Sequence, residues 1–264
     1  MTQPTPLLVF TDLDGTLLSH DDYRWTSARP ALKALKSAGA GVIIATSKTA
    51  AEVAPLRRAI GFDAWPAIVE NGAGLLGAGE RSTEKLSRYD NLLELIATMP
   101  SGFRGFAAMS DREVADLTGL TRAAARRARC RKFSEPGIWQ GTQADLDRFL
   151  AAAAHLGLKA QRGGRFLTLS FGGDKADRLR ELATHYSATC TAALGDAPND
   201  VAMLQAADIG FIVKNPQGPE LPPLPGETEG RIRRTEHVGP EGWNVAILDL
   251  LWGLELIREK ESDG

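Results

Sequence analysis

Residues 9–18 read VFTDLDGTLL and place two aspartates, Asp12 and Asp14, one residue apart directly behind an apolar run. The run LLVF at 7–10 predicts a buried strand, because such strands read as continuous apolar stretches. A turn after the strand explains one aspartate, since Asp side chains bond nearby backbone amides in turns. It does not explain two carboxylates whose charges repel, so the stretch predicts a strand that ends at a polar site.

The segments on either side of this stretch alternate between expected strands and expected helices. Residues 28–39, ARPALKALKSAG, predict an amphipathic helix that Gly39 closes, and GVIIAT at 41–46 predicts the next strand. A strand, a helix and a second strand form a βαβ unit. The same alternation predicts further helices at 49–61, 175–186, 199–207 and 242–259, further strands at 66–69, 165–171, 191–196 and 209–213, and a proline-rich surface loop at 215–227.

Capping residues support two of the expected helix starts. Thr49 and Glu52 stand at capping-box spacing, and Ser110 and Glu113 do the same in the middle of the chain. That middle part, residues 83–164, differs in its residue pattern. Expected helices rich in Ala, Arg and Leu lie between short segments such as FRGFAAM. The sequence therefore predicts an α/β protein with a doubly wound parallel sheet, formed by residues 1–82 and 165–264, and an inserted domain at 83–164.

The composition of the 264 residues fits a globular protein, with 43% hydrophobic residues, 24% charged residues and a net charge of -2. This balance argues against nucleic acid as a partner, and the basic run at 122–132 is read as a solvated helix face. No apolar run is long enough for a membrane span. Cys130 and Cys190 lack metal-site spacing and fit a reducing compartment, so a cytoplasmic monomer or homodimer is expected.

Polar residues follow three of the expected strands at their carboxyl ends, where doubly wound sheets bind ligands. If these strands are neighbours, the groups share one crevice. They are Asp12 and Asp14 after the first strand, Thr46, Ser47 and Lys48 after the second, and Asp196, Asn199 and Asp200 after the strand at 191–196.

This crevice would hold at least four carboxylates, which raise one another's pKa unless a cation neutralises them. All the available ligands are oxygens, which favours a hard divalent ion and indicates Mg²⁺. The four histidines, His20, His155, His185 and His237, are scattered along the chain and are not expected to be ligands.

The remaining groups suit a phosphate: the Thr46 hydroxyl, the Asn199 amide, and a cation from Lys175 at the start of its helix. A carboxylate can act as nucleophile and form an aspartyl-phosphate, while a second, protonated carboxyl gives its proton to the leaving alcohol. The pattern predicts phosphoryl transfer.

The sequence resembles the haloacid dehalogenase superfamily of phosphatases, whose four motifs occur in order as DLDGT, VIIATS, Lys175 in GGDKADRL, and GDAPND. The resemblance implies that Asp12 is the nucleophile and Asp14 the general acid and base. It implies that Thr46 and Lys175 hold the phosphoryl group. It also implies a Rossmann-like core in which residues 83–164 form a cap of C2B type, and a magnesium site made by Asp12, Asp14 (through its backbone carbonyl), Asp196 and Asp200.

Within that superfamily, the segments TSKTAAE, IVENGA, SEPGIW, RGGRFLTL, VKNPQG and GPEGWNVAI look like the mannosyl-3-phosphoglycerate phosphatase branch. This resemblance implies hydrolysis of mannosyl-3-phosphoglycerate or its glucosyl counterpart, a small phosphorylated glycosylglycerate. Two positions depart from the family pattern without removing a catalytic group, Ala197 and Ala176. Substrate contacts are expected from Ser47, Lys48, Glu70, Asn71, Arg162, Gly163, Gly164, Arg165 and Asn199, with Ser134 as a further candidate.

Two other functions stay open at this point. A broad sugar-phosphate phosphatase of the same branch would share every motif. A non-catalytic protein that binds a phosphorylated ligand would be expected to have lost a catalytic carboxylate or the lysine, and here Asp12, Asp14, Lys175 and Asp196 are all present.

Overall fold

The computed structural model describes residues 4–81, 88–163 and 165–257. These residues form two compact units. The first consists of Met1–Thr46 with Lys175–Gly264, and the second of Ser47–Asp174. The sequence predicts a different division, with a core at 1–82 and 165–264 and an insertion at 83–164. That division stays a prediction.

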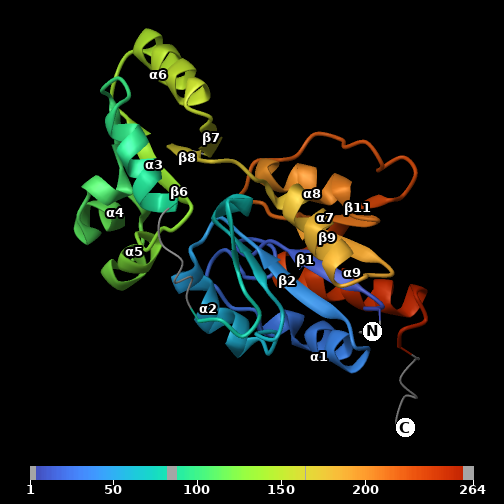
Figure 1. The fold of residues 1–264 in the computed structure, drawn as a ribbon. Helices are drawn as coiled ribbons and strands as arrows, with labels where there is room; N and C mark the ends of the chain where they lie inside the picture. The colour runs from blue at the N-terminus through green and yellow to red at the C-terminus, as the bar shows by residue number, and fades with distance from the viewer. Residues whose placement is uncertain (1–3, 82–87, 164, 258–264) are drawn as a thin grey trace. The chain divides into compact units, whose positions relative to one another are not determined.

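The first unit is built on a parallel sheet in the order β11-β10-β9-β1-β2 (Figure 1). β1 lies between β9 and β2, and Thr11 at its end is level with Leu194 and Ile44. The strands β1, β2 and β9 therefore end at the same edge. Their bounds are β1 Leu8–Thr11, β2 Gly41–Ala45, β9 Thr191–Gly195, β10 Ile209–Lys214 and β11 Ile232–Val238.

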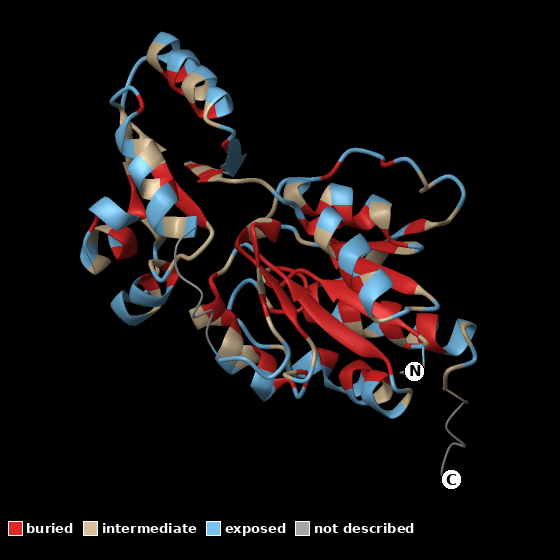
Figure 2. Cartoon of the chain, viewed as in Figure 1, coloured by how far each residue is buried: buried red, intermediate tan, exposed pale blue. Residues whose placement is uncertain are grey.

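Helices cover both faces of this sheet. Figure 1 shows α7 and α8 on one side and α1 and α9 on the other, and Figure 2 shows β1 and β2 buried along their whole length. The helices are α1 Arg29–Ser37, α7 Lys175–His185, α8 Val201–Ala206 and α9 Gly239–Gly253, and short 3-10 turns occupy Thr26–Ala28 and Pro198–Asp200. The expected doubly wound α/β architecture is thereby confirmed.

The second unit contains a helix, an antiparallel hairpin and a four-stranded antiparallel sheet. The hairpin pairs β3 with β4, and the sheet has the order β5-β6-β8-β7. The strands are β3 Ala67–Val69, β4 Gly74–Leu76, β5 Phe103–Gly105, β6 Ser134–Trp139, β7 Lys159–Gly163 and β8 Phe166–Ser170. The helices are α2 Ala50–Ala59, α3 Arg88–Ala97, α4 Asp111–Thr118, α5 Arg122–Ala128 and α6 Gln143–His155, with 3-10 turns at Glu70–Gly72 and Phe106–Ala108.

Two apolar clusters stabilise the four-stranded sheet. In one, Leu167 and Leu169 of β8 pack with Phe149 of α6 and Leu92 of α3. In the other, Phe106 packs with residues of α4 and α5. Both expected capping boxes are present, at the starts of α2 and α4. This part of the second unit thus combines helices with an antiparallel sheet, as its alternating helices and short apolar segments indicate.

The sequence pattern does not mark β11, β6 or β7 as strands. β11 carries exposed charged residues along most of its length, so it lacks the apolar alternation of a strand. β7 is exposed throughout, and β6 contains Pro136, which has no backbone N–H for a sheet ladder. These strands depend on pairing with neighbours, which local patterns do not encode.

Candidate active site

The three strands that end together deliver the predicted polar groups to one place. Asp12 follows β1, Thr46 follows β2, and Asp196 follows β9, and all three residues are buried. The short turn after β9 brings Asp200 beside Asp196, and α7 begins with Lys175. All these residues belong to the first unit, so its fold alone assembles the site.

Lys175 lies at the centre of this arrangement. Its ammonium donates to Oδ1 of Asp12 at 2.7 Å and to Oδ1 of Asp200 at 2.6 Å, and the residue is only 2% exposed. The two contacts connect residues 163 and 25 positions apart in the sequence. A buried ammonium needs such partners, because an unpaired charge in the interior is costly.

Asp196 is held on both carboxylate oxygens. Oδ1 accepts from the Thr16 hydroxyl at 2.7 Å, and Oδ2 accepts from the Asn215 side-chain amide, also at 2.7 Å. Gly15 packs so closely against this pair that a Cβ there would lie 2.4 Å from Asn215 Nδ2, and its φ of +82° also favours glycine. The DGT turn therefore fixes the orientation of Asp196.

Asp200 is also fully engaged. Besides its contact with Lys175, its Oδ2 accepts from the backbone amides of Asp196 at 3.2 Å and Ala197 at 3.1 Å. A Cβ at Gly195 would lie 2.4 Å from Asp200 Cβ, so the close approach requires glycine. Ala197 contributes through its backbone amide, so this bond does not depend on its side chain. Asp200 is thereby well placed to orient Lys175 and the turn that carries Asp196.

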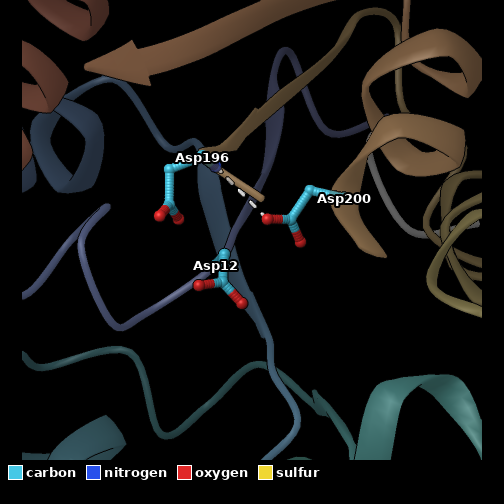
Figure 3. A group of neighbouring side chains, drawn as sticks. All are labelled: Asp12, Asp196 and Asp200. Carbon is cyan, nitrogen blue, oxygen red and sulfur yellow. Dashed lines mark hydrogen bonds between the residues drawn. The ribbon is translucent and has the colours of Figure 1, made fainter. Parts of the chain in front are cut away.

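Three carboxylates converge in this site (Figure 3). Asp12, Asp196 and Asp200 each offer an oxygen atom, and these atoms lie within 4.8 Å of one another. Burial raises the pKa of Asp12 to about 8, with further raising by the charges of Asp200 and Asp196 and partial compensation by Lys175. Burial also raises the pKa of Asp196, although the bonds from Asn215 and Thr16 oppose the rise. Full ionisation of the three carboxylates is therefore unfavourable unless a further positive charge joins Lys175.

Lys175 keeps its proton in this environment. Burial alone would lower its pKa, but the charges of Asp12 and Asp200 outweigh that effect and raise the pKa above its ordinary value. A fixed positive charge beside Asp12 suits a site where negative charge develops during a reaction.

The structure places the other predicted core residues near the ends of the same strands. Asp14 is half-buried in the turn that follows β1, where its backbone bridges to Leu18. Asn199 is half-buried in the 3-10 turn before α8. The fold thus brings together the residues predicted at the strand ends, and Lys175 joins them from the start of α7. The strand-end residues are Asp12, Thr46, Asp196 and Asp200.

The remaining predicted contacts lie in the second unit, at 47–48, 70–71 and 162–165. Ser47 and Lys48 precede α2, and Glu70 and Asn71 follow β3. Glu70 is buried and accepts the hydroxyl of Ser134 at 2.7 Å. How these residues meet a ligand stays a prediction.

The register of β7 and β8 places Arg162 and its neighbour Gln161 on opposite faces of the sheet. Arg162 lies directly opposite Leu167, whose side chain packs against α6, so Arg162 shares that face of the sheet. Gln161 and Thr168, which also face each other, share the opposite side. Arg165 is exposed in the turn between β7 and β8, and Gly164 lies outside the described residues.

Sequence reasoning missed four residues that support the site: Thr16, Asn215, Thr11 and Trp243. The buried indole of Trp243 donates to Oγ1 of Thr11 at 2.9 Å, and that hydroxyl donates to the backbone carbonyl of Asp12 at 2.7 Å. Asn215 follows β10 at its carboxyl end, so the rule that found the other residues applies to it equally. Nothing local in the sequence links Trp243 to the site.

A sequence profile of the haloacid dehalogenase-like hydrolases matches residues 9–122 and 161–218, which together make up more than half of the chain. The chain belongs to this family. The matched stretches of this haloacid dehalogenase-like hydrolase contain Asp12, Asp14, Thr46, Lys175 and Asp196. The expected superfamily membership is therefore confirmed.

Solved structures share the hydrolase's fold over nearly its whole length. A protein of Bacteroides thetaiotaomicron, described among phosphatases of the haloalkanoate enzyme superfamily, is 20% identical with a TM-score of 0.63, covering 96% of both chains. The sucrose-phosphatase of Synechocystis sp. PCC6803, solved with sucrose and phosphate, is 15% identical with a TM-score of 0.60, covering 95% of this chain and 98% of its own. A subclass IIB sugar phosphatase is 18% identical with a TM-score of 0.62, covering 96% and 100%. At these identities the likeness establishes a shared fold.

Within the described parts of the hydrolase, no helix combines the length and the apolarity needed to cross a membrane.

Proposed function

We propose that this hydrolase is a Mg²⁺-dependent phosphatase that acts on mannosyl-3-phosphoglycerate or glucosyl-3-phosphoglycerate and releases the glycosylglycerate and phosphate. The observation that carries the phosphatase assignment is the buried contact of Lys175 with Asp12 and Asp200, beside Asp196. It combines a carboxylate nucleophile, a fixed cation and a set of oxygen donors in one place.

In the proposed reaction, a carboxylate oxygen of Asp12 attacks phosphorus while the bond from phosphorus to the glycerate oxygen breaks. Asp14 gives its proton to that leaving oxygen, and an aspartyl-phosphate remains on Asp12. Water then attacks the phosphorus of this acyl phosphate, Asp14 takes a proton from the water, and phosphate leaves. Lys175 and the Thr46 hydroxyl hold the phosphoryl oxygens throughout.

The donor set fits Mg²⁺. The carboxylates of Asp12 and Asp196, with the backbone carbonyl of Asp14, would hold the ion, and hard oxygen donors of this kind suit it. Asp200 would act beside them, since Lys175 and two backbone amides occupy its oxygens. When bound, Mg²⁺ supplies positive charge that offsets the carboxylates and the transferring phosphoryl group.

The proposed substrate rests on the family-like segments SEPGIW, RGGRFLTL and GPEGWNVAI and on the cap expected at 83–164. Recognition of the glycosylglycerate is assigned to Ser47, Lys48, Asn71 and the arginines around the β7–β8 turn, whose guanidinium groups suit a carboxylate. Neighbouring folds named as sugar phosphatases agree with a phosphorylated sugar derivative. The free thiols of Cys130 and Cys190 agree with a reducing, cytoplasmic setting.

A broad sugar-phosphate phosphatase is the second candidate, and the fold shared with the subclass IIB sugar phosphatase favours it. Both candidates use the same residues for the reaction. They differ in how strongly the rest of the substrate is recognised.

The test is a phosphate-release assay on mannosyl-3-phosphoglycerate, glucosyl-3-phosphoglycerate and simple sugar phosphates, with Mg²⁺ or with a chelator. Asp12→Asn serves as the control for contaminating phosphatases. The proposal expects release that needs Mg²⁺ and a kcat/KM highest for a glycosyl-3-phosphoglycerate. Equal kcat/KM across the panel would favour the broad phosphatase, and no release from any ester would contradict both.

A further inference from the structure

The carboxylate of Glu70 is enclosed by hydrogen-bond donors of the chain itself. The residue is 3% exposed. Its Oε1 accepts from the backbone amide of Lys132 at 3.0 Å, and its Oε2 accepts from the amides of Phe133 at 3.2 Å and Ser134 at 2.8 Å, and from the Ser134 hydroxyl at 2.7 Å. Four donors from three consecutive residues thus surround the carboxylate.

The backbone at Glu70 takes a conformation that needs support. Glu70, Asn71 and Gly72 have φ values of +52°, +57° and +95°, three left-handed residues in succession. Non-glycine residues rarely adopt this region, so the surrounding contacts must impose it. The turn also packs tightly, because a Cβ at Gly72 would lie 2.2 Å from the backbone of Asp174.

The same turn holds the chain that follows β2. The amide of Glu70 donates to the carbonyl of Lys48 at 3.0 Å, and Arg131 donates to the carbonyl of Ser47, also at 3.0 Å. The Arg131 guanidinium lies 3.9 Å from the Glu70 carboxylate. Glu70 is therefore connected to 47–48 through its backbone and, through Arg131, by charge.

From these contacts we propose that Glu70 is a positioning residue for the phosphatase reaction, rather than a substrate ligand. It locks the left-handed turn, and the turn fixes two segments, 47–48 and 173–174. Residue 47 directly follows Thr46, and residue 174 directly precedes Lys175, so both segments lead into residues that hold the phosphoryl group. This inference rests on the proposed function.

Glu70→Gln is the decisive variant, because it keeps the shape of the side chain and changes one acceptor into a donor. The carboxamide oxygen can still accept on the Ser134 side, but its NH₂ group would face the Lys132 amide. One hydrogen bond is replaced by a contact between two donors, which a buried site does not tolerate. Ser134→Ala is a milder version, since it removes only the hydroxyl bond.

The expected result is a loss in kcat of about tenfold or more for Glu70→Gln, because small displacements of catalytic groups are costly. The loss should be equal on a glycosyl-3-phosphoglycerate and on p-nitrophenyl phosphate, and KM should change less than about twofold. Ser134→Ala should lose kcat in the same direction by a smaller factor. Equal losses on both esters are expected because the phosphoryl group is common to them.

Glu135→Gln is the matched control. Glu135 is equally buried, adjoins Ser134, and accepts from the Tyr89 hydroxyl at 2.6 Å and the Ala107 amide at 2.7 Å. Neither hydrogen bond leads toward 47–48 or 173–174. The charges of Arg131 and Glu70 also act on Glu135, so both variants lose a charge near Arg131 and they differ in the hydrogen bonds that they remove. This variant should lower the thermal midpoint and leave kcat unchanged, so it separates general destabilisation from positioning.

Two kinetic outcomes would overturn the proposal. A rise in KM confined to the glycosyl substrate, with p-nitrophenyl phosphate unaffected, would make Glu70 a substrate contact. Equal losses of kcat in Glu70→Gln and Glu135→Gln would make both residues merely structural.

Amide hydrogen exchange keeps the inference testable if the wild-type protein releases no phosphate, a result that would count against the proposed function. Glu70→Gln should then speed exchange at 47–48, 70–72 and 173–174 at least about tenfold, and Glu135→Gln should not. Unchanged exchange in these segments would overturn the positioning role whatever the activity.

Discussion

Removing divalent cations should make the folded protein less stable as pH rises, and Asp12 is the main reason. Its pKa in the folded chain is about 8, against an ordinary value of 3.8, chiefly because the carboxyl is buried. Between these two values the folded state binds a proton at Asp12 that the unfolded state has lost. The contribution of Asp12 to the free energy of unfolding is therefore fully present below about pH 4, and it declines as pH rises toward 8.

The size of the effect follows from the difference in proton affinity. Each pKa unit corresponds to about 1.4 kcal/mol. A pKa of about 8 in place of 3.8 therefore lowers the free energy of unfolding by roughly 5 kcal/mol at most between pH 4 and pH 8. In the middle of this range the slope for one proton is about -1.4 kcal/mol per pH unit. Burial raises the pKa of Asp196 as well, which adds a contribution of the same sign.

Urea unfolding followed by circular dichroism between pH 5 and pH 8, in the presence of a chelator, measures this slope. Asp12→Asn is the control, because asparagine keeps the shape but does not titrate. The free energy of unfolding of the wild type should fall more steeply with pH than that of the variant. The difference isolates Asp12 from every other group that titrates in the range. Adding Mg²⁺ should remove most of the decline, because a cation held at the proposed site would offset the charge of the carboxylates.

A chelated wild type whose stability rises with pH, or whose slope equals that of Asp12→Asn, would refute this reasoning. It would mean that Lys175 neutralises the cluster without help, and the case for a divalent cation would lose its electrostatic basis.

Four further substitutions test individual roles. Asp12→Asn should abolish phosphate release in a colorimetric assay, and sustained turnover would disprove its role as nucleophile. Asn215→Ala removes a bond to Asp196 and should raise the Mg²⁺ concentration for half-maximal activity about 10–100-fold, an increase that titration of activity against Mg²⁺ detects. Arg165→Ala should raise KM for a glycosyl-3-phosphoglycerate about 30-fold and leave p-nitrophenyl phosphate unaffected, as expected for a lost charged hydrogen bond. Arg162→Ala should have the smaller effect because Arg162, although exposed, shares the sheet face of Leu167, which packs against α6, and the reverse order would contradict that assignment.

The core of the site could be predicted from the sequence because a few local signals suffice. Apolar runs mark the strands, and parallel strands bring their carboxyl ends to one edge, so Asp12, Thr46 and Asp196 follow directly. Lys175 is predicted from its place at a helix start and in the series of motifs. These inferences need the order of elements but no knowledge of distant contacts.

The supporting contacts could not be predicted because they join residues far apart in the sequence. The bond between Thr16 and Asp196 spans 180 positions, and no periodicity or capping pattern encodes such a distance. Glu70 shows a related difficulty. Its place in a motif-like segment suggests a ligand, whereas only the folded chain reveals the four donors that occupy its carboxylate.

The bond from Trp243 to Thr11 also has a consequence for the order in which the protein becomes active during synthesis. Thr11 holds the backbone carbonyl of Asp12, yet the indole that fixes the Thr11 hydroxyl is made 232 residues later. A nascent chain that already contains Asp12, Lys175 and Asp196 still lacks the helix that secures the strand end before Asp12, the proposed nucleophile. Catalytic competence should therefore arise late in translation, when α9 docks, and not when the last catalytic residue is added.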